Sequence, residues 1–148
     1  GALTIGTLDG ANVEIREAVG AENFFLFGLT AAEAAELQAN GYRPRERYER
    51  SETMREALDA LVSGAFSRGD RELFRPLVDG LLERDPFLLL ADFDGYLACQ
   101  ARVDALWRDP AGWTRKSILN VARMGRFSAD RSILEYCDKI WKTRPMPI

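Results

Sequence analysis

The sequence of 148 residues contains no histidine, and this absence excludes several kinds of site. Histidine is the usual general base near neutral pH and the commonest metal ligand, so Ser/His/Asp, Cys/His and histidine metal sites are all excluded. Its two cysteines, Cys99 and Cys137, lie far apart and form no metal-type pair. Each falls on the apolar stripe of an expected helix, which predicts small buried side chains in a reducing compartment rather than a disulfide or a nucleophile.

Long apolar runs and an excess of charge of one sign are also missing. The longest apolar run, residues 87–91, is far too short to cross a membrane. Lys and Arg number 20 against 23 Asp and Glu, with the two signs interleaved, so we expect no nucleic-acid partner and no membrane. The basic run 43–47 is interrupted by Glu46 and followed by Glu49. This pattern favours a solvated, self-paired surface, with an anion site as the alternative.

What the chain does have is the composition of a folded domain. Hydrophobic residues make up 47% and charged residues 29%, and the length is enough for one domain with a sizeable core. The chain opens at Gly1 inside an apolar, glycine-punctuated segment and without an initiator methionine. Because autonomous domains usually begin with a loose polar end, we expect Gly1 to be an internal residue of a longer protein.

The first 29 residues carry a strand–helix–strand pattern. Residues 3–5 are apolar and end at a glycine, and residues 23–28 form an apolar run typical of a strand that is buried on both faces. Between them, Asp9 is placed to cap a helix from residue 11 to about 18, and Gly20 is placed to end it. This βαβ unit predicts the end of a parallel sheet, and hence the α/β class with two or three short strands.

Residues 30–148 form a helical remainder, for which cap residues and apolar spacing predict five or six helices. The expected segments are 30–40 with a capping box of Thr30 and Glu33, 53–64 with a candidate box of Thr53 and Glu56, 73–82, 94–107, 109–125 with Asp109 as cap, and 128–141 with Ser128 as cap and residues 144–147 as its end. Pro76 leaves two possibilities for the third helix, a start near Arg75 or a kink.

The glycine-rich loop 6–11 is the first candidate site. It precedes a helix, so its N–H groups could cradle an anion, but it matches neither the Rossmann nor the P-loop pattern and Asp9 would repel an anion. We therefore favour a turn and helix cap. Asp9 and Glu14 could also serve as a carboxylate pair for glycoside chemistry. Acidic residues are expected in the first turn of any helix, which favours the structural interpretation.

Aromatic and acidic clusters give two further candidates. Six aromatic residues could stack on sugar rings, although their strand and helix spacing favours core packing: Phe24, Phe25, Phe27, Trp107, Trp113 and Trp141. Residues 92–95 resemble part of a calcium loop, but the closing glutamate is missing. No complete catalytic constellation emerges, so we predict no catalytic, cofactor-binding or metal-binding residue in this chain.

Several blocks of the sequence resemble the carboxyl-terminal end of the α-glucan phosphorylases, which comprise the glycogen and maltodextrin enzymes. The most specific is GALTIGTLDGANVE at residues 1–14. The others follow in family order: ENFFLFG at 22–28, Asn40-Gly41-Tyr42 with Tyr48, SGAFS at 63–67, residues 92–96 with Cys99-Gln100, residues 113–115, and residues 125–131 running to Ile140-Trp141. Together they cover essentially the whole chain.

The resemblance implies an enzyme that transfers α-1,4-linked glucosyl units from glycogen, starch or maltodextrin to inorganic phosphate, giving glucose 1-phosphate with retention. It implies pyridoxal 5′-phosphate held on a lysine, with the cofactor phosphate as proton donor and acceptor. It also implies two Rossmann-like domains in the GT-B arrangement, a homodimer and a cytoplasmic location. The family's cofactor lysine and its phosphate-binding residues precede the block at residues 1–14, so none has a counterpart here, and no cofactor is expected on this chain.

On this resemblance, residues 1–148 are a partial carboxyl-terminal domain, with 1–29 ending the sheet and 30–148 as the helical remainder. Residues 1–14 would buttress the cofactor-bearing segment, and residues 128–141 would brace the other half of the enzyme. The chain departs from familiar members in lacking histidine and in its arginine-rich stretch 43–50. An autonomous helical interaction module derived from a phosphorylase tail is the alternative function.

Overall fold

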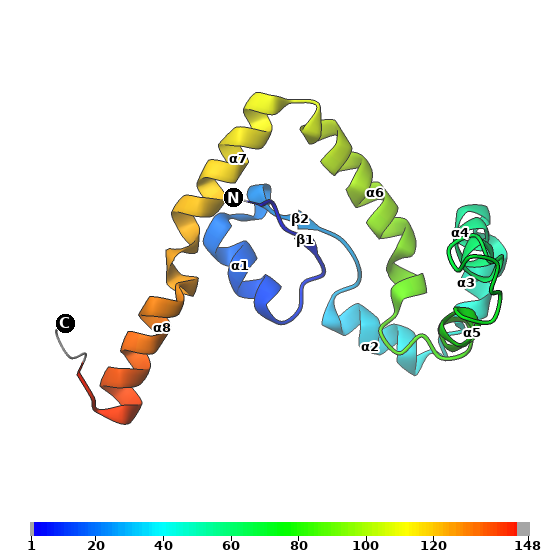
Figure 1. The fold of residues 1–148 in the computed structure, drawn as a ribbon, viewed down its shortest axis with the longest axis horizontal. Helices are drawn as coiled ribbons and strands as arrows, with labels where there is room; N and C mark the ends of the chain where they lie inside the picture. The colour runs from blue at the N-terminus through cyan, green and yellow to red at the C-terminus, as the bar shows by residue number, and fades with distance from the viewer. Residues whose placement is uncertain (1, 145–148) are drawn as a thin grey trace.

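The computed structural model describes residues 2–144 and is mostly helical, with a small parallel sheet at its centre. Strand β1 (Ile5–Gly6) pairs in parallel with β2 (Phe25–Leu26), with Ile5 opposite Phe25. Helix α1 (Ala11–Val19) and a 3-10 turn, η1 (Ala21–Asn23), connect the strands (Figure 1). The predicted βαβ unit is confirmed. Gly6 lies inside the first strand rather than after it, because its carbonyl accepts a hydrogen bond from the N–H of Phe27 at 3.2 Å.

The start of α1 differs from the prediction. Gly10, with a φ of 48°, is the N-cap residue, and the side chain of Asp9 makes no capping bond. The carboxylate of Asp9 instead accepts a hydrogen bond from the hydroxyl of Thr7 at 3.3 Å. The backbone carbonyl of Asp9 accepts the N–H of Asn12, so the chain enters the helix through its backbone. Gly20 ends α1 as predicted.

Seven α-helices follow β2 in the described part of the chain, against the five or six expected. They are α2 (Ala31–Ala39), α3 (Pro44–Arg50), α4 (Glu52–Val62), α5 (Arg75–Glu83), α6 (Leu89–Trp107), α7 (Pro110–Arg123) and α8 (Ala129–Tyr136), with a 3-10 turn η2 (Met124–Phe127) before α8 and a π-helical turn η3 (Cys137–Trp141) after it. Helix α3 was not predicted, because its charged sequence PRERYER lacks an apolar stripe.

Two of the predicted caps are confirmed. The hydroxyl of Thr30 accepts the N–H of Glu33, and the carboxylate of Glu33 accepts the N–H of Thr30 at 2.7 Å, which completes the capping box of α2. The carboxylate of Asp109 accepts the N–H of Gly112 at 3.0 Å at the start of α7. Pro76 lies in the first turn of α5, so the helix starts near Arg75 without a kink.

Two other caps are corrected. The hydroxyl of Ser51 accepts the N–H of Met54 and caps α4, so Thr53 is already helical. Ser128 occupies the N-cap position of α8 without a side-chain capping bond, and its carbonyl accepts the hydroxyl of Ser132. The end predicted for the last helix falls mainly on residues 145–147, which lie outside the described residues.

The apolar core lies among helices α3 to α6, in a unit of residues 42–90 that we call the helical lobe. Met54, Leu58, Val78 and Leu90 are buried together at its centre. Helices α7 and α8 form a long arm that runs away from the lobe (Figure 1). The arm is attached to the βαβ unit through Arg123, whose guanidinium donates to the carbonyl of Val19 at 2.5 Å. Among residues 2–144, no helix is both long enough and apolar enough to span a membrane.

A buried carboxylate closes the helical lobe. The side chain of Asp85 is 1% exposed and accepts three hydrogen bonds, all at 2.8 Å, from the Tyr42 hydroxyl and from the N–H groups of Leu89 and Leu90. Asp85 therefore connects Tyr42, at the start of the lobe, with the first turn of α6. Leu88, just before this turn, has a left-handed φ of 57°. Burial and the hydrogen bond to Asp85 raise the pKa of Tyr42.

We expect the helical lobe to lose stability as the pH rises above about 10. The folded-state pKa of Tyr42 lies above the ordinary value of 10.0, so the folded chain keeps a proton that the unfolded chain releases. The stabilisation is complete below the unfolded pKa and is lost as the pH rises beyond it. Urea unfolding measured from about pH 8 to about pH 11 should show a smaller decline for Tyr42→Phe than for the parent. Equal declines in the two proteins would contradict this assignment.

Candidate functional site

A pocket of about 240 Å³ lies where both strands end, and we call it the strand-edge pocket. It is lined by side chains from three segments: 7–9 after β1, 29–34 after β2, and 87–92 at the start of α6. In parallel α/β sheets, ligands bind beyond the carboxyl ends of the strands. The pocket therefore occupies the position where this fold class places its functional groups.

Close packing of Gly28 against Asp92 gives the pocket its shape. The carboxylate of Asp92 accepts the N–H of Leu29 at 2.8 Å and so fixes the chain just after β2. Gly28 has a φ of 82°, and a Cβ placed on it would lie 2.7 Å from Oδ2 of Asp92 and 2.8 Å from Cγ2 of Thr7. Only glycine fits this approach. Arg102 of α6 also donates to the carbonyl of Leu26 at 2.6 Å, which holds α6 against β2.

The polar groups of the pocket are largely bonded to one another. The Thr7 hydroxyl donates to Asp9, and the Thr7 carbonyl accepts the side-chain amide of Asn12 at 3.0 Å. The Thr30 hydroxyl and N–H both bond to Glu33, and the backbone hydrogen bond from Thr30 is the main cause of the lowered pKa of Glu33. This carboxylate already occupies the N-terminus of α2, which is where an anion would otherwise bind.

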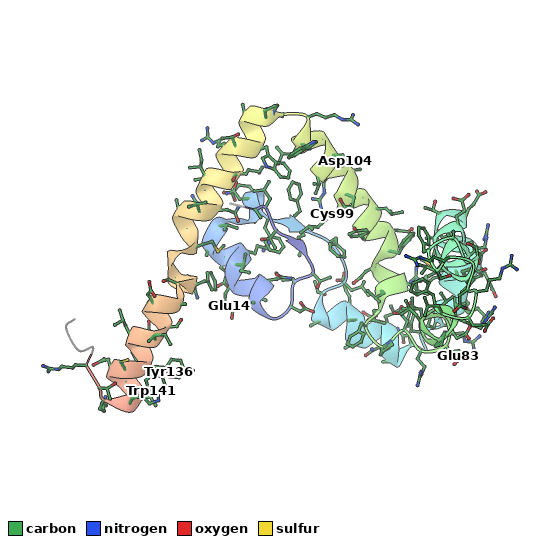
Figure 2. All side chains as sticks on the ribbon, in the orientation of Figure 1. Glu14, Glu83, Cys99, Asp104, Tyr136 and Trp141 are labelled. Atoms are coloured by element: carbon green, nitrogen blue, oxygen red, sulfur yellow. The ribbon has the colours of Figure 1, made fainter. Side chains whose placement is uncertain are left out.

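The charge of the pocket argues against phosphate as its ligand. Its charged lining groups are the carboxylates of Asp9 and Asp92, with no lysine or arginine among the described residues that line it. The glycine-rich loop 6–11 is thus a turn with a backbone cap, in keeping with the interpretation favoured from sequence. Glu14 is exposed on α1 (Figure 2) and does not line the pocket with Asp9, so the structure does not assemble the suggested carboxylate pair there.

The aromatic residues divide into two groups. Phe24 is buried, and the ring of Phe27 packs edge-on against Tyr96 at 5.3 Å, so core packing is confirmed near the sheet. The same prediction is wrong for Trp107 and Trp141, which are 66% and 56% exposed. Helical spacing identifies an apolar face but not what covers it, and residues 2–144 cover these two indoles only in part.

Three of the exposed aromatic residues, Trp107, Tyr136 and Trp141, lie on the arm and at its junction with α6. Trp107 packs edge-on against Trp113 at 4.9 Å, and Tyr136 lies 5.5 Å from Trp141 at the outer end of the arm (Figure 2). The predicted apolar stripe of the last helix is exposed as well. Its large members are Ile133, Leu134, Ile140 and Trp141.

The other candidates behave as structural groups. Cys99 is fully buried and Cys137 partly buried, and both are free thiols, so no disulfide forms between them. Residues 92–95 lie inside α6 rather than in a loop, which rules out the calcium-loop geometry. In the described part of the chain, no group of three acidic or cysteine side chains could hold a metal ion. The sequence does not predict the Tyr42–Asp85 pair, since 43 residues separate its members.

Comparison with known proteins gives a consistent result along the whole chain. A family model described as carbohydrate phosphorylase matches residues 1–143. A glycogen phosphorylase of Synechocystis is 55% identical over 148 residues, which is 100% of this chain. The brain form of glycogen phosphorylase from Bos taurus is 48% identical and the muscle form 46%, each over 145 residues or 98% of the chain. The chain spans 17% of the length of the Synechocystis and bovine brain proteins.

Proposed function

Because this chain belongs to the carbohydrate phosphorylase family, we propose that it forms a structural part of a glycogen phosphorylase. The whole enzyme would transfer α-1,4-linked glucosyl units from a glucan to inorganic phosphate and release glucose 1-phosphate. The observation that carries the proposal is 55% identity to a glycogen phosphorylase along all 148 residues. The role of this chain would be structural, to position other parts of the enzyme.

We also propose pyridoxal 5′-phosphate as the cofactor of the whole enzyme, held outside this segment. The cofactor requires a lysine for its imine and cationic or N–H groups for its phosphate. The strand-edge pocket does not fit those requirements, since its charged lining groups are carboxylates and the N-terminus of α2 is occupied by Glu33. No catalytic, cofactor-binding or metal-binding role is assigned to its residues.

The proposed arrangement is the carboxyl-terminal part of a Rossmann-like GT-B domain, with residues 1–29 ending the sheet and 30–148 as the helical remainder. Two features support it. Each strand in the described residues has one partner, so both outer edges of the sheet are open to further strands. Apolar side chains such as Ile118, Val121 and Ile140 are more than half exposed on the arm. Both features fit a segment that packs against more protein, in a homodimeric, cytoplasmic enzyme.

The alternative, an autonomous helical interaction module, is less well supported. An isolated domain rarely exposes apolar residues along a whole arm, and a two-stranded sheet is marginal on its own. The alignment to a glycogen phosphorylase also covers the strands, the lobe and the arm. Partner capture through the arm would be a consequence of the missing enzyme rather than a separate function.

A chimeric host tests the proposed function. In this host, the present chain replaces the matching 148 residues of the Synechocystis enzyme, and phosphate-dependent release of glucose 1-phosphate is measured. We expect the chimera to be folded and active, and the same enzyme lacking the segment to be inactive. A chimera that folds and carries its cofactor but releases no glucose 1-phosphate would overturn the proposal.

A further inference from the structure

A second pocket, of about 190 Å³, lies between the end of α2 and helix α3, and we call it the arginine pocket. Its charged lining groups are Arg43, Glu46, Arg47 and Arg50, and the ring of Tyr42 lines one side. The strand-edge pocket has the opposite character, because its charged lining groups are both carboxylates. The arginine pocket therefore favours anions, whereas the strand-edge pocket does not.

The three arginines line the same pocket, two from α3 and one from the residue before it. Arg47 and Arg50 are three residues apart on α3, and Arg43 is the residue just before the helix, with extended backbone. Arg47 and Arg50 are about 4.5 Å apart along the helix axis, at about 1.5 Å per residue, and Arg43 lies beyond the start of the helix. A guanidinium group presents a planar fork of donors that matches phosphate oxygens two at a time.

The carboxylate in the pocket does not neutralise these arginines. Glu46 lies 3.5 Å from Arg43 and 3.9 Å from Arg50, at the long end of ion-pair distances, and the two arginine side chains are 78% and 79% exposed. Exposed pairs of this kind contribute little to stability. Arg47 makes no hydrogen bond or ion pair with any residue among 2–144. Three guanidinium groups thus face one carboxylate.

We propose that the arginine pocket binds a small anion with two linked phosphate groups. One phosphate is too small to contact three guanidinium groups spread along two turns of helix, whereas a diphosphate can bridge them. The side chains of Leu37 and Tyr42 provide an apolar wall beside the charges, suited to an organic group attached to the diphosphate. The volume of about 190 Å³ suits the diphosphate itself, and a larger organic group would extend out of the pocket along this wall.

The alternative is a solvated surface whose charges pair with one another, but the pocket does not contain enough negative charge for complete pairing. Glu46 is shared between two arginines, so at most one positive charge is compensated. The carbonyl end of α2 adds only a partial negative charge. Arg47, whose side chain makes no hydrogen bond or ion pair among residues 2–144, is therefore the side chain on which the proposal is tested.

The test uses the chimeric host and calorimetric titration with inorganic pyrophosphate at constant ionic strength. We expect Arg47→Gln to weaken binding about tenfold or more, since it removes a charged hydrogen-bond donor. Arg45→Gln is the matched control, because it removes the same charge from the same helix outside the pocket lining, and should change the affinity less than about twofold. Release of glucose 1-phosphate should stay unchanged in both variants.

Parallel titrations with inorganic phosphate and uridine diphosphate separate the ligand classes. Stronger binding of uridine diphosphate than of pyrophosphate would identify an organic diphosphate, and equal binding would identify the bare diphosphate. Hydrogen exchange should show protection by pyrophosphate within residues 37–50. Equal weakening by Arg45→Gln and Arg47→Gln, equal affinity for phosphate and pyrophosphate, or no binding at all would overturn the proposal, whatever the activity of the chimera.

Discussion

Replacing Asp85 by alanine is expected to destabilise the helical lobe by about 3–5 kcal/mol. The substitution leaves the N–H groups of Leu89 and Leu90 without their acceptor at the start of α6, and it also removes the partner of the Tyr42 hydroxyl. These groups are buried or partly buried, so water cannot fully replace the carboxylate. The N–H of Leu88, which bonds to the backbone carbonyl of residue 85 at 3.0 Å, keeps its acceptor in this variant.

Native-state hydrogen exchange on the chimeric host measures this effect as the opening free energy of amides in residues 42–90. Tyr42→Phe is the matched control, because it removes one of the three hydrogen bonds and should cost about 1 kcal/mol. Exchange in α7 and α8 should change little in either variant, since the lobe has its own core. An Asp85→Ala effect no larger than that of Tyr42→Phe would show that Asp85 does not organise the lobe.

Gly28→Ala is expected to cost roughly 2–4 kcal/mol and to distort the strand-edge pocket. The new methyl group would lie within 2.8 Å of both Asp92 and Thr7, and the backbone would keep a φ of 82° that alanine resists. To relieve the clash, Asp92 would have to move and release the N–H of Leu29. The junction between β2 and α6 would open as a result.

Gly41→Ala provides the control for this substitution. Gly41 also has a positive φ, of 78°, but no atom lies within 4 Å of an added Cβ, so only backbone strain of about 1 kcal/mol is expected. The opening free energies of amides in β2 and the first turn of α6, again from hydrogen exchange, compare the two. Equal effects at Gly28 and Gly41 would mean that the contact with Asp92 has no structural role.

Two helix caps were predicted correctly because the residues that form them are close together in the sequence. The capping box of Thr30 and Glu33 and the Asp109 cap involve residues three apart, so the sequence contains all the information they need. At α4, Ser51 and Thr53 are both good cap residues, and the choice depended on the end of α3 at Arg50, which was not predicted. Helix α3 itself depends on packing against α4, α5 and α6 rather than on an apolar stripe.

Long-range features were not accessible in the same way. The bonds from Tyr42 to Asp85 and from Leu29 to Asp92 join residues 43 and 63 positions apart, and no periodicity in the sequence marks them. The exposure of Trp107 and Trp141 was also not predicted, but for a different reason. Their apolar pattern was predicted correctly, but the described residues cover the two indoles only in part. For the arginine pocket, the sequence showed the run of charged residues but not that three of the arginines line one pocket.

In the proposed function, this chain contributes structure rather than catalytic groups to a phosphorylase. The most direct test is the rate of phosphate-dependent glucose 1-phosphate release by the chimeric host with Asp9→Asn and Glu14→Gln together. Both carboxylates are exposed, and Asp9 lines the strand-edge pocket, so they are the strongest catalytic candidates in the chain. The account predicts a kcat within about twofold of the unmodified chimera, whereas a fall of about a hundredfold or more, typical of losing an acid–base group, would contradict it.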